Sequence, residues 1–242
     1  MSMPVMIDSH AHIVFGVDDG AIDMDMSLAM LRMMQAQGIG AVVCTSHSSI
    51  DMEKYHAHFE ELRVRAEAEG IPVRLYRGCE VACGRLWMHI ILRQIQESYL
   101  PLMNGSSCIL AEFAPYMQTD EIIDCVSQLL GTGLQVVVAH PERYRALQEN
   151  YAAARTLTDM GALLQVNAYS LAEESFEGTR NLAQWLVAER MASLLGSDAH
   201  RLTHRPPKVD SGVAYIRAHC DPDYAEDLLR RNAQRLYGCE LA

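Results

Sequence analysis

Short apolar, often β-branched runs alternate with longer amphipathic segments along most of this chain. The amphipathic segments repeat apolar residues at three- and four-residue intervals, the pattern of a helix that buries one face. In the first of them Leu28, Leu31 and Met34 recur at this interval before Gly38 ends the segment. The short runs predict strands at residues 5–7, 41–45, 73–76, 108–111, 135–139, 163–166 and 192–195.

The amphipathic segments between these strands predict helices. Gly38, Gly70, Gly131 and Gly161 each stand before a predicted strand, where a glycine just past a helix end is expected. The helices are predicted near residues 25–37, 52–69, 85–97, 120–130, 146–160, 179–189 and 222–236.

This regular alternation predicts an α/β fold. Strands joined by a crossover helix run parallel and lie in one sheet. Seven such units, with no linker, repeat or low-complexity tract, favour one domain over residues 1–242. We expect a closed or nearly closed β/α barrel, and an open doubly wound sheet is the alternative.

Composition narrows the possible functions. Half of the 242 residues are apolar and 21% are charged, so the chain can build a sizeable core. Acidic residues outnumber basic ones by 31 to 20, for a formal charge of −11, which argues against a nucleic-acid partner. The chain shows no secretory signal and no apolar run of about 18 residues, so we expect a cytoplasmic protein without membrane insertion. Its seven cysteines lack C-x-x-C pairs and are expected to be reduced and buried.

Histidines and acidic residues follow almost every predicted strand. In a parallel β/α barrel the carboxyl ends of the strands meet at one face, where barrel enzymes place their chemistry. His10 and His12 are two positions apart on extended backbone, so their side chains point to the same side. The side chains of ligand type at this face are those of His10, His12, Asp19, His47, Glu80, Glu112, His140, Asp198 and His200.

These nine imidazoles and carboxylates exceed the needs of one four-coordinate ion and predict two or three ions. Nitrogen and oxygen ligands without thiolate suit Mn, Fe or Zn better than Ca or Mg. A single histidine after a strand is most often a hydrogen-bonded structural residue, so the prediction rests on the whole set. Asp18 is the alternative ligand to Asp19, or it shapes the turn before Gly20.

The other histidines have a simpler interpretation. His56, His58 and His89 lie in predicted helices and His219 lies just before the last one, and we expect all four to face solvent.

The motifs DSHAH, TSH, GCE, AEF, AHPERY and SDAH, in this order and spacing, resemble the polymerase and histidinol phosphatase (PHP) superfamily. The opening DSHAHIVFGVDDGAIDMDMSLAML is most similar to manganese-dependent protein-tyrosine phosphatases of bacterial capsule and exopolysaccharide operons. The likeness runs from about residue 6 to the C-terminal RRNAQRLYG. It implies a distorted TIM-like (β/α)7 barrel with three divalent ions. Manganese is favoured, and iron or zinc are the alternatives.

The resemblance also distributes the ligands. One ion would be held by His10, His12, Glu80 and Asp198, a second by Glu80, Glu112 and His140, and the third by Asp19, His47 and His200. Three divalent ions against four carboxylates leave about +2, which attracts a phosphate dianion although the chain is acidic overall.

Arg143 and Arg205 match the arginines with which the family holds phosphate. The resemblance thus implies hydrolysis of phosphotyrosine by a hydroxide that bridges the metals. The implied substrate is the C-terminal tail of a polysaccharide-export tyrosine kinase. Relatives can carry basic residues after the position of His47, whereas this chain has Ser-Ser-Ile-Asp at 48–51, so we expect that loop to contribute little to peptide recognition.

Several alternatives share part of this pattern. A histidinol-phosphate phosphatase, or another small-molecule phosphomonoesterase, would use the same fold and metals. Metal-dependent nucleases of the TatD type also begin with H-x-H, but they lack the terminal D-x-H. A non-enzymatic PHP module would be expected to lack ligands, and here all nine positions are filled.

Cys79 and Arg85 fit the C-x5-R spacing of cysteine-dependent tyrosine phosphatases. The phosphate loop of those enzymes turns its backbone N–H groups toward the anion. Here Glu80 places a carboxylate beside the sulfur, and the loop holds a single glycine, Gly84. We therefore expect no covalent catalysis by Cys79.

Overall fold

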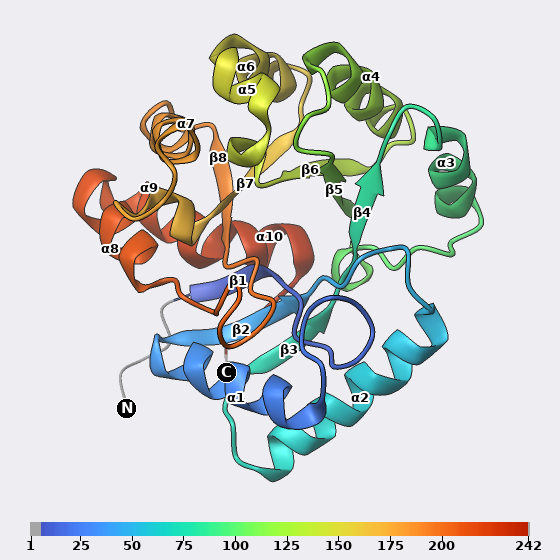
Figure 1. Cartoon of the computed structure of the whole chain (residues 1–242), viewed down its shortest axis with the longest axis vertical. Coiled ribbons are helices and arrows are strands. Elements are labelled where there is room, and N and C mark those ends of the chain that lie inside the picture. Colours follow the sequence, from blue (N-terminus) through green and yellow to red (C-terminus); the bar gives the residue numbers. More distant parts are fainter. Residues whose placement is uncertain (1–5, 242) are drawn as a thin grey trace.

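The strands form two parallel sheets in the computed structural model, which describes residues 6–241 (Figure 1). The first sheet has the order β1 (Met6–Ala11), β2 (Ile39–Cys44) and β3 (Arg74–Arg77). The second contains, in chain order, β4 (Glu80–Cys83), β5 (Cys108–Phe113), β6 (Gln135–Ala139), β7 (Leu163–Asn167) and β8 (Ala192–Gly196). All pairings within the sheets are parallel, which confirms the α/β prediction. Val5 of the predicted first strand lies outside the described residues.

The two sheets are joined by isolated bridges instead of a continuous ladder. Ala11, at the end of β1, pairs in parallel with Ala199, which follows β8. On the other side His47, which follows β2, pairs with Glu80, the first residue of β4. Of the closed or nearly closed barrel that the sequence predicts, the closed form is not present as one continuous sheet. The bridges lie at the carboxyl ends of β1, β2 and β8, beside the predicted ligands.

The third predicted strand is followed by one that was not predicted. Gly78 and Cys79 separate β3 from β4, and the Tyr55 hydroxyl lies against this break. Its oxygen is 2.7 Å from the Cys44 carbonyl oxygen and 2.9 Å from that of Gly78. A Cβ on Gly78 would lie 2.8 Å from Cγ1 of Val43, so only glycine allows this turn to approach β2 so closely. The break is set by tertiary contacts, and the four-residue β4 carries too little periodicity to be recognised.

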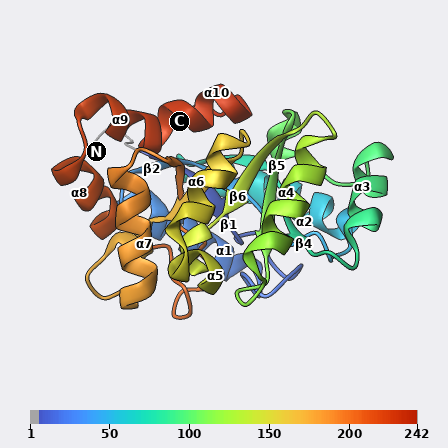
Figure 2. The same ribbon diagram turned by 90° about the horizontal axis from the view of Figure 1, so that it is seen from above.

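Helices surround the strands in two perpendicular views (Figures 1 and 2). They are α1 (Met24–Ala36), α2 (Met52–Ala68), α3 (Met88–Gln96), α4 (Thr119–Leu130), α5 (Arg145–Glu149), α6 (Tyr151–Asp159), α7 (Glu177–Ala188), α8 (Asp210–His219), α9 (Pro222–Glu226) and α10 (Asn232–Tyr237), with a π-helical segment Asp227–Arg231 before α10. Across residues 6–241, none of them is both long enough and apolar enough to cross a membrane.

The helices differ from the predicted ones at three places. The segment predicted at 146–160 is broken at Asn150, where the backbone is extended at φ −143°, and α8 was not predicted at all. Gly131 has a right-handed φ of −61°, and Gly133, at φ +84°, takes the left-handed conformation instead. The other three glycines predicted to follow helices do have positive φ: Gly38, Gly70 and Gly161.

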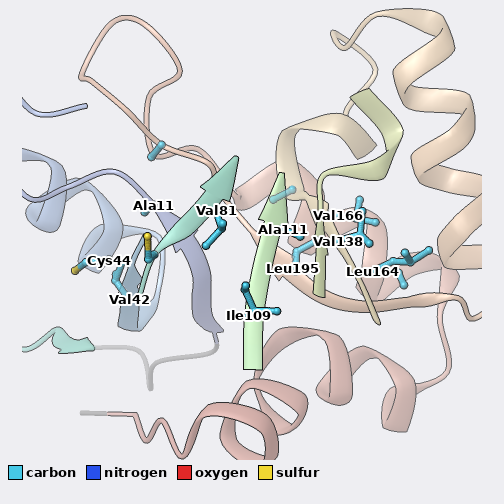
Figure 3. Close-up of a cluster of buried hydrophobic side chains, with 14 of the residues drawn as sticks. Ala11, Val42, Cys44, Val81, Ile109, Ala111, Val138, Leu164, Val166 and Leu195 are labelled. Atoms are coloured by element: carbon cyan, nitrogen blue, oxygen red, sulfur yellow. The ribbon is translucent and has the colours of Figure 1, made fainter. Parts of the chain in front are cut away.

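Alternate residues of each strand pack into two apolar clusters. In β6, Val136 and Val138 join the large cluster beneath the helices, several of whose members appear in Figure 3. Val137 and Ala139 point the other way, into a smaller cluster that contains Tyr237 of α10. Burial on both faces explains why the strands read as continuous apolar runs. All seven cysteines are free thiols and six are buried, as predicted, while Cys220 is partly exposed.

The C-terminal segment closes the amino end of the strands. The Asn232 side chain donates a hydrogen bond to the Ser193 carbonyl oxygen, near the start of β8, over 2.7 Å. This leaves the carboxyl ends as the open side of the fold.

Tyr55→Phe should lower the free energy of unfolding by about 1–2 kcal/mol, because the Cys44 and Gly78 carbonyls would lose a buried donor. Urea denaturation measures the change. Tyr99→Phe is the control, since Tyr99 is 53% exposed, and it should leave stability unaltered. Equal stability of the Tyr55 variant and the wild type would contradict a stabilising role for this hydroxyl.

Candidate metal centre

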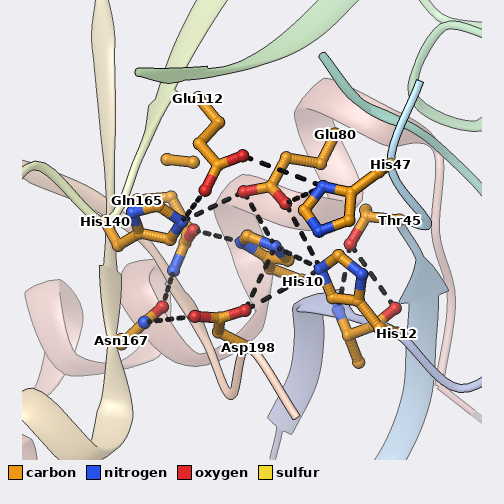
Figure 4. Close-up of polar contacts among 12 residues, drawn as sticks. His10, His12, Thr45, His47, Glu80, Glu112, His140, Gln165, Asn167 and Asp198 are labelled. Carbon is orange, nitrogen blue, oxygen red and sulfur yellow. Dashed lines mark hydrogen bonds and ion pairs between the residues drawn. The ribbon is translucent and has the colours of Figure 1, made fainter. Parts of the chain in front are cut away.

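All nine residues predicted as ligands come together, eight of them near or after the carboxyl end of a strand and Glu80 at the start of β4, and most appear in Figure 4. Their imidazole nitrogens and carboxylate oxygens form four overlapping groups whose atoms lie within 4.8 Å of one another. The groups are His12, Asp19, His47 and His200; His10, Glu80 and His140; His10, His12 and Asp198; and His47, Glu80 and Glu112. Shared members in neighbouring groups suit a site for several cations held close together.

Glu80 lies at the centre of this cluster, buried at the start of β4 (Figure 4). Its Oε1 is 3.0 Å from His140 Nε2 and 3.3 Å from His10 Nε2. Its Oε2 is 3.3 Å from His12 Nε2 and 3.2 Å from His47 Nδ1. Burial alone would raise the pKa of Glu80, but the surrounding histidines, His10 foremost, lower it well below its ordinary value. A carboxylate that faces imidazoles with both oxygens is placed to bridge cations.

Asp198 forms the second carboxylate of the buried part. Its Oδ1 is 3.6 Å from His10 Nε2 and 3.8 Å from His12 Nε2. Burial opposes ionisation, yet His10 and His140 lower the pKa of Asp198. Its backbone lies in the left-handed region at φ +53°, as does that of His140 at φ +31°. Such conformations cost non-glycine residues about 1–3 kcal/mol and persist where surrounding contacts hold them.

Asp18 and Asp19 differ in where their carboxylates lie relative to the cluster. Asp19 is 57% exposed, and its Oδ1 lies 3.4 Å from both His47 Nε2 and His200 Nε2, inside the cluster. Asp18 contacts the Nδ1 side of the His12 ring, whereas Nε2 of that ring faces Glu80. Asp18 Oδ2 is 2.8 Å from His12 Nδ1 and accepts the backbone N–H of His47 over 3.2 Å. Asp18 therefore orients a ligand-type histidine, while Asp19 joins the set itself.

The electrostatic field in the cluster favours positive charge. Burial disfavours protonation of His12, but hydrogen bonds to Asp18 and Glu80 outweigh it and raise its pKa to about 10. The negative potential that holds a proton there also attracts a divalent cation.

His200 behaves in the opposite way. Burial and nearby His12 lower the pKa of His200 to about 3, so the ring is neutral at physiological pH. Its Nδ1 lies 2.9 Å from the Asp198 carbonyl oxygen, and its buried Nε2 has no hydrogen-bond partner among the described residues. A neutral imidazole whose free nitrogen faces a carboxylate of the cluster is a suitable metal ligand.

Two polar residues of β7 that the sequence analysis missed, Gln165 and Asn167, form hydrogen bonds with residues of the cluster. Gln165 Oε1 is 2.8 Å from His10 Nδ1, and Gln165 Nε2 donates to Asn167 Oδ1 over 2.9 Å. Asn167 in turn donates to Asp198 Oδ2 over 3.1 Å. The signal was present, because two polar residues at alternate positions of the apolar strand LLQVN must share one face.

Two further buried carboxyl groups hold the loops that carry site residues. Asp8 accepts the Ser197 backbone N–H over 2.8 Å and the Ser197 hydroxyl over 2.5 Å, and burial raises the pKa of Asp8 to about 6. Glu142 accepts the backbone N–H of Asn167 over 2.9 Å and the Ser170 hydroxyl over 2.7 Å. Burial also raises the pKa of Glu142. These contacts fix the segments that precede Asp198 and Arg143.

His58 does not face solvent as predicted. Its ring stacks on Phe15 with centroids 4.2 Å apart, and its Nδ1 is 2.8 Å from the Phe15 carbonyl oxygen. Together with Lys54, which donates to the Gly16 carbonyl over 2.6 Å, it ties the loop carrying Asp19 to α2. His56 is also partly buried, whereas the remaining two of that group are exposed as expected: His89 and His219.

Both predicted phosphate-binding arginines lie beside the cluster and remain about one-third exposed. Arg143 donates from Nη1 to Asp198 Oδ2 over 2.6 Å. Arg205 lies 3.3 Å from the same oxygen and 3.4 Å from Asp19 Oδ2. Both arginines line a cavity of about 480 Å³, together with Asp198. The cavity thus joins the cluster to cationic side chains that can hold an anion.

Cys79 is buried, and burial raises the pKa of its thiol. Its sulfur lies 3.8 Å from the Glu80 carbonyl oxygen, and it does not line the cavity. A buried thiol with a raised pKa is a poor nucleophile, in line with the argument against a C-x5-R mechanism.

Comparison with known proteins gives relatives over nearly the whole chain. Tyrosine-protein phosphatase CpsB of Streptococcus pneumoniae is 30% identical over 241 residues, which cover 96% of this chain and 98% of that protein. Tyrosine-protein phosphatase YwqE of Bacillus subtilis is 30% identical over 210 residues, which cover 83% of this chain and 79% of that protein.

Solved structures show the same fold. A structure from a study of YwqE from Bacillus subtilis and CpsB from Streptococcus pneumoniae, described as metal-dependent tyrosine phosphatases, has a TM-score of 0.88 at 24% identity, covering 98% of this chain and 96% of that one. An organophosphorus hydrolase from Deinococcus radiodurans shares the fold more distantly, with a TM-score of 0.64 at 15% identity, covering 98% and 95%.

The family model described as capsular polysaccharide synthesis, CpsB/CapC, matches residues 6–237. This confirms the resemblance to phosphatases of capsule and exopolysaccharide operons. The chain belongs to the CpsB/CapC family of capsular polysaccharide synthesis.

Proposed function

We propose that this protein is a metal-dependent protein-tyrosine phosphatase. The observation that carries the proposal is the cluster of five imidazoles and four carboxylates in four overlapping groups, with two arginines at its edge. Relatives named tyrosine-protein phosphatases at 30% identity, one of which covers nearly all of the chain, support the same activity.

The donor set fits divalent cations. It contains imidazole and carboxylate donors without thiolate, and the buried His200 Nε2 has no partner of its own among the described residues. We assign the nine residues as ligands of three ions, with manganese as the first choice and iron or zinc as alternatives. Divalent ions there would neutralise phosphate oxygens and lower the pKa of a water molecule to roughly 7.

The protein's own groups then position the substrate. Arg143 and Arg205 present planar guanidinium groups whose N–H forks match two phosphate oxygens. Asp198 fixes both guanidinium groups beside the cluster, so the phosphate meets them in a preset orientation. Hydrolysis breaks the bond between phosphorus and the tyrosine oxygen, and water supplies the new oxygen. A phenolate leaving group, with a pKa of about 10, needs little help from a general acid.

The proposal extends to context. The substrate would be the phosphotyrosine tail of a polysaccharide-export tyrosine kinase, as the sequence resemblance implies, and membership of a capsular polysaccharide synthesis family supports a substrate from that process. We place the protein in the cytoplasm, where its seven free thiols would stay reduced. The chain would act as one metallophosphatase domain. We interpret the two sheets, joined by two bridges, as a distorted (β/α)7 barrel whose strand pairing is interrupted at both junctions.

Removing divalent metal should lower hydrolysis of a phosphotyrosine peptide at least ~100-fold, because the ions supply the charge and the activated water. Adding Mn²⁺ back should restore it. Phosphate release is measured beside histidinol phosphate as the competing substrate. Full turnover by metal-stripped protein, or a clear preference for histidinol phosphate, would refute the proposal.

Cys79→Ser should keep most of the turnover, since the buried thiol has no chemical role.

Arg143→Lys should retain metal but lose ~1–3 kcal/mol of transition-state stabilisation, which is about 5- to 150-fold in kcat/KM. An ammonium cannot reproduce the planar fork of a guanidinium. Arg145→Lys is the matched control, because Arg145 is 77% exposed and its one ion pair within residues 6–241 is with Glu149 on its own helix. Steady-state kinetics with one phosphotyrosine peptide decides, and equal kcat/KM for both variants would show that Arg143 does not hold phosphate.

Asp18→Ala should weaken metal binding by about 10- to 100-fold, because Asp18 fixes the ring of His12 without joining the ligand set. Titration against a competing chelator measures the affinity. Asp25→Ala on the exposed side of α1 should change nothing. Wild-type affinity in the Asp18 variant would mean that His12 needs no such support.

A further inference from the structure

The cavity beside the cluster of ligand-type side chains is lined by both charged and aromatic residues. It lies between the loop after β7 and the loop after β8, and its volume is about 480 Å³. Arg143, Asp198 and Arg205 supply charge, whereas Tyr169 and Phe176 supply aromatic surface. Ligand pockets typically measure roughly 300–1,000 Å³ and combine apolar walls with a few polar groups, so this cavity is of ordinary size and make-up for one small group.

The two aromatic side chains are unusually open to solvent. Phe176 is 87% exposed and Tyr169 is 46% exposed. An isolated exposed phenylalanine needs no explanation. Two exposed aromatic rings that line the same cavity as Arg143 and Arg205 indicate a binding role, because the flat apolar face of a ring packs well against another ring.

The segment that carries Tyr169 is held in place by buried polar contacts. Tyr169 lies in the 3₁₀ segment Ala168–Leu171, directly after β7. The residues on both sides of it, Asn167 and Ser170, donate to the buried carboxylate of Glu142 over 2.9 and 2.7 Å. Phe176 immediately precedes α7. The anchored segment presents the Tyr169 ring at little entropic cost when a ligand binds, and Phe176 stands at the start of a regular helix and lines the same cavity.

We propose that this cavity is the subsite for the substrate's phenyl ring, and that Phe176 and Tyr169 set a preference for aryl over alkyl phosphate monoesters. This inference rests on the proposed phosphatase function. With its phosphate held by the two arginines, a phosphotyrosine ring extends along the cavity and stacks against these side chains. A small, hydrophilic alcohol phosphate gains nothing from the same walls. Substrate recognition then lies in the loops after β7 and β8, on residues other than those that follow His47.

The test compares one aryl and one alkyl substrate in the Mn²⁺-loaded protein. Phe176→Ala should raise KM for a phosphotyrosine peptide about tenfold, equivalent to ~1.4 kcal/mol of lost ring contact, and should leave kcat within about twofold. Hydrolysis of the matching phosphoserine peptide should be unchanged relative to wild type. Phe176→Trp should retain the preference. Tyr99→Ala, an exposed aromatic residue after α3, is the control and should affect neither substrate.

Binding measurements separate this subsite from the catalytic proposal. Calorimetric titration with phenylphosphonate should show about tenfold weaker binding to Phe176→Ala, while the affinity for inorganic phosphate and the metal content stay constant. Equal weakening of both ligands, or no weakening of phenylphosphonate, overturns the ring subsite. A wild-type protein that binds phenylphosphonate through Phe176 yet hydrolyses no phosphotyrosine would instead refute the phosphatase proposal and leave the aryl subsite standing.

Discussion

The Glu80 carboxylate, buried among four imidazoles, is the interaction on which the rest of the site depends. An isolated carboxylate in this position would be costly to ionise, because burial removes its solvation. Imidazoles from the ends of β1 and β2 and from the first turn after β6 offset that cost only if all of them converge. The chain brings them together at the point where the two sheets meet, since Glu80 also forms the bridge to His47.

This convergence requires backbone conformations that would not form by themselves. His140 and Asp198 both have positive φ, and each lies close in the chain to a buried carboxyl contact: Ser197, bound by Asp8, precedes Asp198, and Glu142 follows His140 by two residues. Asp8 binds Ser197 on one side, and Glu142 binds the segment after β7 on the other. The ligand-type side chains therefore depend on a second layer of polar contacts. Burying these polar groups has a desolvation penalty, and in return they hold the ligand-type side chains in fixed orientations.

The apolar interior limits the polar cluster to one end of the strands. Alternate strand residues fill the space beneath the cluster, and Tyr237 and the C-terminal helices close the amino end. Polar chemistry is thus confined to the carboxyl ends, where the loops are free to vary. In this chain the segments after β6 and β8 provide Arg143 and Arg205 and the loop after β7 provides two aromatic rings, which suits a substrate with both a phosphate and a phenyl group.

The sequence by itself determined the parallel α/β architecture and the nine ligand-type residues. Strand–helix alternation and side chains that follow strand ends are local features, and parallel topology alone brings those ends to one face. Only the tertiary structure decided that β4 is separate from β3, that the sheets join through two bridges, and that Asp19 enters the cluster while Asp18 supports His12. Adjacent residues such as these two aspartates have the same local chemistry, and what separates them is the direction in which a folded loop points each side chain. The polar support by Gln165 and Glu142 was likewise hidden, because a buried polar residue acquires its role from partners that are distant in the chain.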